Sequence, residues 1–202
     1  MGQGTGTRAQ RHRETRQRIL DAAWEIAREQ GLAAMSLRDL GDRVGMRAPS
    51  LYSYFPSKAA IYDAMFAGAN LELLARLTPI AASTGGHAAA GSRLRRGSRA
   101  WMRFCCEDPV RFQLLYQRTI PDFVPTAESF ELAERVVTLL TAALAEAGRT
   151  SSRDADLFTA YLSGLAAQQI ANDPGGSRWS RLVDHTVATF LDPPAHHTEE
   201  HA

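Results

Sequence analysis

Side chains that can donate hydrogen bonds gather in one short stretch of the sequence, between residues 36 and 58. No acid occurs between Asp42 and Asp63. Such a surface suits phosphate oxygens and the base edges of a DNA groove. We expect Arg47, Ser50 and Tyr52 to read bases and Ser36, Tyr54 and Lys58 to hold phosphates. The full expected DNA-binding set is Ser36, Arg38, Arg47, Ser50, Tyr52, Ser53, Tyr54 and Lys58.

Two short helices are needed to position these donors. Ser36 followed by Asp39 is typical of a helix start, and Gly45 can adopt the left-handed conformation that ends a helix. The apolar stripe between them is Leu37, Leu40 and Val44. A second helix is expected from about Arg47 until Pro56 stops it. The pair predicts a helix-turn-helix, although a solvated helical hairpin in an ordinary bundle is the alternative.

The same stretch resembles a known family. Gly45-Met46, Leu51-Tyr52 and Tyr54-Phe55-Pro56-Ser57-Lys58 are similar to the core motif of the tetracycline-repressor (TetR) family, and the resemblance covers residues 13 to 66. Family members often carry Ser where Arg47 stands, so the usual cap of the second helix is missing here. The resemblance implies a dimeric DNA-binding regulator with a ligand cavity in its C-terminal domain.

Charge is distributed unevenly along the 202 residues. The net charge is only +1, yet the chain through Lys58 holds ten Lys and Arg against six Asp and Glu. This asymmetry suits an N-terminal part that faces DNA. The sequence has neither an apolar run long enough to cross a membrane nor the apolar core of a signal peptide. Cys105 and Cys106 are adjacent, which disfavours an ordinary disulfide between them. We therefore expect a cytoplasmic protein.

Helical periodicity continues to the end of the chain, and no segment alternates as a strand would. We expect an all-α fold of about nine helices. Residues 1–12 should be a disordered basic arm, 13–57 the helix-turn-helix domain, 58–192 a ligand-binding and dimerisation domain, and 193–202 a disordered tail. The first helix should begin at residue 13 and the fourth should end before Pro79. The glycine-rich stretch 81–92 should be a loop, and Ser177 should begin the last helix.

The C-terminal part shows no set of residues that would support catalysis. We find no phosphate-binding glycine loop and no metalloprotease or hydrolase motif, and the tail histidines have no fixed geometry. We therefore expect neither an enzyme nor a bound metal or cofactor. Aromatic residues with polar tips predict a site for a small, mostly apolar effector, although filling of the core is an equal alternative. The expected ligand-binding set is Trp101, Phe104, Cys105, Phe112, Tyr116, Phe123, Tyr161, Leu165 and Gln168.

Wide apolar arcs on the last two helices predict a homodimer. Two recognition helices must lie about 34–36 Å apart on a palindromic operator, which a symmetric dimer provides. The expected interface is Leu157, Leu165, Ile170, Leu182, Val183, Val187 and Phe190. Our hypothesis is that the protein is a ligand-responsive repressor. The alternative is a helical carrier of small molecules whose hairpin is only structural.

Overall fold

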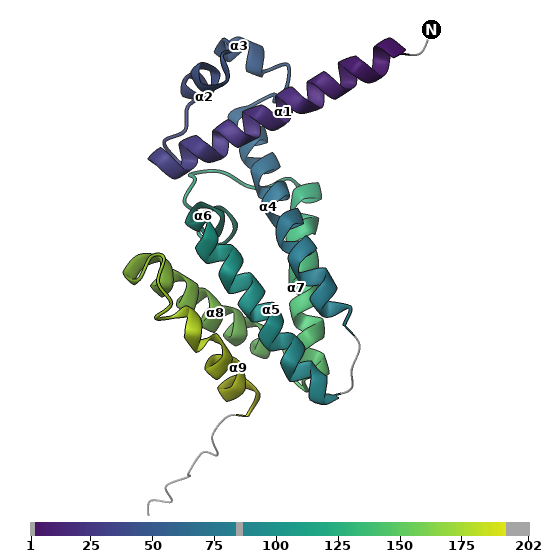
Figure 1. Ribbon diagram of the computed structural model, residues 1–202, viewed down its shortest axis with the longest axis vertical. Helices are drawn as coiled ribbons and strands as arrows, with labels where there is room; N and C mark the ends of the chain where they lie inside the picture. The colour runs from purple at the N-terminus through teal and green to yellow at the C-terminus, as the bar shows by residue number, and fades with distance from the viewer. Residues whose placement is uncertain (1–2, 84–86, 193–202) are drawn as a thin grey trace, which may run out of the picture. The chain divides into compact units, whose positions relative to one another are not determined.

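The computed structural model describes residues 3–83 and 87–192, and over this range every regular element is helical (Figure 1). The all-α prediction is confirmed. The predicted tail, 193–202, lies outside the described residues. The elements in chain order are α1 Gln3–Gln30, α2 Leu37–Val44, α3 Ala48–Leu51, α4 Lys58–Ala81, α5 His87–Glu107, α6 Pro109–Tyr116, α7 Ala127–Glu146, α8 Ser152–Asn172, the 3-10 helix η1 Ser180–Leu182 and α9 Val183–Leu191.

The disordered arm expected over residues 1–12 is wrong for residues 3–12, because helix α1 already begins at Gln3, whereas residues 1–2 lie outside the described residues. Its early turns are supported by contacts one turn apart. Gln10 Nε2 donates to Glu14 Oε1 at 3.0 Å, and Arg11 Nε donates to the carbonyl of Thr7 at 3.3 Å. Neighbours four apart on a helix stabilise it in this way, which the low apolar content of the segment concealed.

Helices α4 and α5 also extend beyond their expected bounds. Helix α4 continues through Pro79 to Ala81. A proline leaves the carbonyl four residues earlier without a partner, here that of Ala75, an exposed residue whose carbonyl water can reach. Helix α5 begins at His87, inside the expected loop, and Ala90 in its first turn is buried. Helix α9 begins later than expected, at Val183, after η1.

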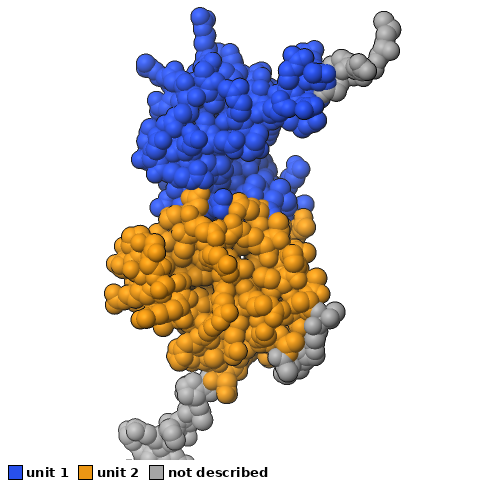
Figure 2. Space-filling model, in the orientation of Figure 1, with its two compact units in different colours: residues 1–71, 110–133 blue, residues 72–109, 134–202 orange. Residues whose placement is uncertain are grey.

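The chain divides into two compact units, shown in different colours in Figure 2. Unit 1 comprises residues 1–71 and 110–133, and unit 2 comprises residues 72–109 and 134–202. The first turns of α4 and the segment around α6 therefore belong with the N-terminal helices. The expected functional boundary at residues 57/58 does not coincide with this structural division.

Unit 1 is built around one apolar cluster. Ile19, Ile26, Leu40 and Leu51 from the first three helices, and Phe55 just after α3, are almost fully buried in it. Helix α4 adds buried residues from Ile61 to Phe66, and α6 adds Val110 and Leu114. Burial of this cluster stabilises the two short helices, α2 and α3, which would be only marginally stable in isolation.

In unit 2, α5 packs against α8 and α9. Phe104 and Phe158 are fully buried, and the Phe158 ring meets that of Phe190 edge-on at 5.0 Å. Arg149 Nη2 donates to the carbonyls of Phe190 and Leu191 at 2.8 and 2.9 Å. It thereby caps the C-terminal end of α9, where a cation is favourable.

Candidate nucleic-acid interface

The first helix of the expected pair is built as its residues indicate. Ser36 Oγ accepts from the Asp39 amide at 3.1 Å and donates to the Asp39 carboxylate at 2.6 Å. Gly45 ends α2 with a φ of 70°, the left-handed region open to glycine. The prediction of α2 and both of its ends is confirmed.

The second helix is shorter than expected. Helix α3 covers only Ala48–Leu51, after an extended Arg47 whose side chain makes no capping bond. The chain then turns, with the amides of Tyr54 and Phe55 both donating to the Leu51 carbonyl at 2.9 Å. The expected helix up to Pro56 is therefore a single α turn followed by tighter turns. Without a side-chain cap, little fixes a longer helix.

Gly41 sets the distance between α2 and the turn that follows, a role that sequence reasoning missed. A Cβ atom there would lie 2.6 Å from the Met46 carbonyl oxygen and 3.2 Å from the Ala48 nitrogen. Gly41 is fully enclosed, and its α-helical position gave no sign of a close approach. The absence of a side chain lets the two helices meet.

The expected DNA-binding residues fall into two groups. Arg38, Arg47, Ser50 and Tyr52 are exposed, and the side chains of both arginines have no hydrogen-bond or ion-pair partner among the described residues. Tyr52 is 54% exposed, a large value for an aromatic residue. The donors of this group are therefore free to meet another molecule.

The other four already contact the protein. Ser36 is occupied with Asp39, as described, and Ser53 Oγ donates to the Ser50 carbonyl at 2.7 Å. The ring of Tyr54 stacks on that of His12, with centroids 4.8 Å apart. Lys58 Nζ lies 5.5 Å from the Tyr62 ring centroid. Their contacts with DNA stay predictions.

The N-terminal half of α1 lies against residues 53–55, which follow α3, and this contact includes His12 from the segment expected to be disordered. Arg16 Nη1 donates to the Tyr54 carbonyl at 2.7 Å, and its guanidinium lies 4.0 Å from the Phe55 ring centroid. His12 Nε2 is 3.4 Å from the Ser53 carbonyl oxygen. The exposed Arg8, Arg11 and Arg13 extend the basic character of this side.

Arg43 differs from the free arginines of α2 and α3. It contacts Glu25 at 3.2 Å and Glu29 at 2.6 Å, both on α1. Hydrogen bonding to Arg43 lowers the pKa of Glu29. The charge of Arg43 is thus paired inside unit 1, and we do not include Arg43 in the proposed interface.

Asp63 joins α4 to the start of α7 within unit 1. Its carboxylate accepts from the Thr126 amide at 2.8 Å, from Thr126 Oγ1 at 3.1 Å and from the buried Ser129 Oγ at 2.8 Å. Asp63 lies about one and a half turns after Lys58, the first residue of α4. This cluster of Asp63, Thr126 and Ser129 therefore fixes the start of α7 to the first turns of α4.

The expected ligand-binding residues are spread over both units. Phe112, Tyr116 and Phe123 lie in unit 1, where the Phe112 and Tyr116 rings are 5.6 Å apart and Phe123 contacts Tyr62 at 5.7 Å. The other members lie in unit 2: Trp101, Phe104, Cys105, Tyr161, Leu165 and Gln168. Phe104 and Cys105 are fully buried, whereas Tyr161 is 49% exposed. A common cavity for these residues stays a prediction.

Unit 2 contains a pocket of about 690 Å³ between α5 and the connection from α8 to α9. None of the nine expected ligand residues lines it, although their sequence neighbours Cys106 and Gln169 do. Burial raises the pKa of both thiols, Cys105 and Cys106. Since the thiolate is the reactive form, burial lowers the reactivity of both thiols.

Two of the expected dimer residues need correction. Val183 and Val187 are buried inside unit 2, at 1% and 0% exposure, so they cannot meet a partner surface. They face α5 and α8, because α9 turns its most apolar side inward. Leu157 is exposed, and Leu165, Ile170, Leu182 and Phe190 are half-buried. The neighbouring Tyr161, expected in the ligand site, also lies exposed on α8.

Residues 19–65 match the family described as "Bacterial regulatory proteins, tetR family". The chain is also 47% identical over 53 residues to the HTH-type transcriptional repressor KstR of Mycobacterium tuberculosis. That alignment covers 26% of this chain and 23% of the relative, so the chain spans about a quarter of the length of the curated relative that it matches. The resemblance of the N-terminal region is confirmed.

Solved structures of similar fold extend over most of the chain. The TetR family transcriptional regulator PfmR from Thermus thermophilus is 21% identical, with a TM-score of 0.65 over 86% of this chain and 96% of that one. The transcriptional regulator FadR from Bacillus subtilis, solved in complex with stearoyl-CoA, is 15% identical, with a TM-score of 0.67 over 87% and 97%. At these identities the likeness concerns the fold. Over residues 3–83 and 87–192, none of the helices has the length and apolar character that a membrane span requires.

Proposed function

We propose that this chain, whose residues 19–65 belong to the tetR family of bacterial regulatory proteins, is a ligand-responsive transcriptional repressor. It would bind a palindromic operator as a homodimer in the cytoplasm. The observation that carries the proposal is the exposed donor surface at α2 and α3. Its free arginines, Arg38 and Arg47, stand beside an exposed tyrosine, on a helix pair held by a closely packed turn.

We propose two kinds of DNA contact for this surface. Arg47, Ser50 and Tyr52 are free to reach base edges, where sequence is read. The phosphate contacts that we propose for Ser36, Arg38, Ser53, Tyr54 and Lys58 position the protein without reading sequence. The cations at the start of α1 would add electrostatic attraction alongside them.

The dimer that we propose uses the outer face of α8 together with α9. Leu157 and Tyr161 are one turn apart and exposed, which favours burial against a second copy. Leu165, Ile170, Leu182 and Phe190 remain in the proposed interface at its half-buried margin. Two copies related by a two-fold axis would present two recognition segments to two half-sites.

A small, mostly apolar effector is the ligand that we propose for the C-terminal domain, as expected from its aromatic residues. The fold shared with FadR, which was solved with stearoyl-CoA, is compatible with this class of ligand. For a nearly complete switch, the effector must bind the DNA-free state about 10⁴-fold more tightly than the DNA-bound state.

The test is a fluorescence anisotropy titration of a labelled fragment from upstream of the chain's own gene, at two salt concentrations and with scrambled competitor. We expect specific binding near 10⁻⁸ M, on the order of that of other regulators, and a complex of two chains per site by light scattering. Failure to bind any DNA at low salt would favour the carrier alternative.

An Arg47→Ala protein tests the interface directly. We expect operator affinity to fall by about 1–3 kcal/mol, because a free guanidinium at a base edge is lost. Arg118→Ala is the matched control, since Arg118 is also exposed and has no partner among the described residues of unit 1. Equal losses in the two proteins, measured by the same titration, would contradict a specific role for Arg47.

A further inference from the structure

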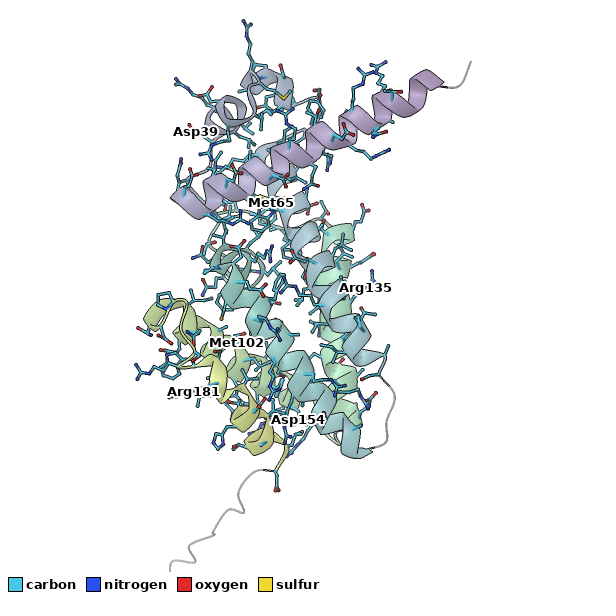
Figure 3. The ribbon with its side chains drawn as sticks, viewed as in Figure 1. Asp39, Met65, Met102, Arg135, Asp154 and Arg181 are labelled. Carbon is cyan, nitrogen blue, oxygen red and sulfur yellow. The ribbon has the colours of Figure 1, made fainter. Side chains whose placement is uncertain are left out.

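The pocket in unit 2 combines two kinds of wall. Arg99, Met102, Arg103 and Cys106 lie on one stripe of α5, since each is three or four residues from at least two of the others. Met102 is 2% exposed and forms part of the floor with Ile170. Arg99 and Arg103 of α5 and Arg181 of η1 are exposed, so their charged ends lie at the rim of the pocket. Met102 and Arg181 are labelled in Figure 3.

The two acids that line the pocket, Glu107 and Asp184, are already in ion pairs, although the partner of Glu107, Arg76, also pairs with Glu72. Arg99 Nε donates to Asp184 Oδ1 at 2.6 Å and also contacts the second carboxylate oxygen, and this hydrogen bonding lowers the pKa of Asp184. Glu107 accepts from Arg76 Nη1 at 2.6 Å. The side chains of Arg103 and Arg181 have no ion-pair or hydrogen-bond partner among the residues that the structure describes. The pocket therefore has two guanidinium groups that pair with none of its acids.

The wall opposite α5 is held in shape by hydrogen bonds within the chain. Gln169 is 2% exposed, and its Oε1 accepts from the amides of Trp179 and Ser180 at 2.9 and 3.0 Å. The Asp173 carboxylate accepts from the Arg178 amide at 2.8 Å. These bonds fix the turn from Pro174 to Ser177 that lines the pocket. A largely preformed pocket needs little ordering when it binds.

We propose that this pocket binds a small amphipathic organic anion, with a carboxylate or phosphate group between Arg103 and Arg181 and an apolar body over Met102 and Ile170. Guanidinium groups match the planar oxygens of carboxylate and phosphate with paired hydrogen bonds. A volume of about 690 Å³ is in the range of ordinary ligand sites. The site is separate from the nine residues that the sequence suggested, and it goes beyond the proposed function by naming the ligand's charge.

Isothermal titration calorimetry of the full chain without DNA tests the proposal with four probes that share one apolar body: octanoate, octyl phosphate, octylammonium and octanol. We expect octanoate or octyl phosphate to bind saturably, and the better of the two identifies the head group. Octylammonium and octanol should bind at least roughly tenfold more weakly, since the first is repelled by guanidinium and the second offers one uncharged acceptor in place of an anion. Equal binding of octylammonium, or no saturable binding of either anion, would overturn the proposal.

The double variant Arg103→Gln/Arg181→Gln locates the binding. The affinity for the anion should be lower than that of the parent by roughly tenfold or more. The control Arg135→Gln/Arg153→Gln changes the net charge equally, at two exposed arginines outside the pocket, and should bind as the parent does. Equal affinities in the two double variants would contradict the assignment. Because no DNA is present, this result is independent of the operator titration, which alone decides the proposed function.

Discussion

A Gly41→Val protein is expected to lose operator binding and to unfold its N-terminal helices in less denaturant than the parent. The first atom of any side chain at residue 41 would lie 2.6 Å from the Met46 carbonyl oxygen, which is backbone and cannot rotate away. The two helices must then move apart. Overpacking of this kind costs about 3 kcal/mol, and it displaces Arg47, which follows Met46 directly. Urea unfolding followed by circular dichroism, with anisotropy on the operator, measures both effects.

Gly68→Val is the control for that experiment. Gly68 also lies within a helix, α4, but it is exposed and a Cβ there would meet nothing within 4 Å. The change from glycine to a β-branched residue is therefore the same, without the clash. We expect unchanged stability within about 0.5 kcal/mol. If both valine proteins behaved alike, the close approach at Gly41 would have no energetic consequence.

An Asp63→Ala protein should be the second strongly altered variant. The change leaves the buried Ser129 hydroxyl and the Thr126 amide without their acceptor. Hydrogen bonds to a charged group contribute about 1.5–3 kcal/mol each. Because Asp63 is only half-buried and water can replace part of the loss, we expect about 2–3 kcal/mol in total by urea unfolding.

The reference for Asp63→Ala is Asp156→Ala. Asp156 is exposed on α8, and its side chain has no hydrogen-bond partner among the described residues. Removing it should change the free energy of unfolding by less than about 0.5 kcal/mol. An Asp63→Ala protein as stable as this reference would show that α7 begins correctly without the cluster.

Local features of the interface could be predicted from the sequence, because their causes lie within a few residues. Ser36 caps α2 by accepting from the amide of Asp39, three residues on, and Gly45 ends α2 by adopting a positive φ. The length of α3 was not predicted, because the apolar spacing from Leu51 to Phe55 fits a continued helix as well as the turns that are present. The side chains of Arg47, Ser50 and Tyr52 are exposed, as their spacing in the sequence indicated.

Features that depend on distant partners were missed for a physical reason. Gly41 looks like any weak helix residue until the Met46 carbonyl is placed beside it. Asp63 meets Thr126, 63 residues away, which no periodicity reveals. Val183 and Val187 have the same apolar pattern as residues of a dimer surface, and only the packing of α5 and α8 shows that they face inward.

The Thr126 amide offers a way to watch the start of α7 while the protein remains folded. Its hydrogen is held by the Asp63 carboxylate and not by a carbonyl of its own helix. Amide exchange with deuterated water requires that bond to open, so the exchange rate of this single site reports how often α7 separates from α4. An effector that loosens the joint would speed exchange at Thr126 without changing the rate at the centre of either helix.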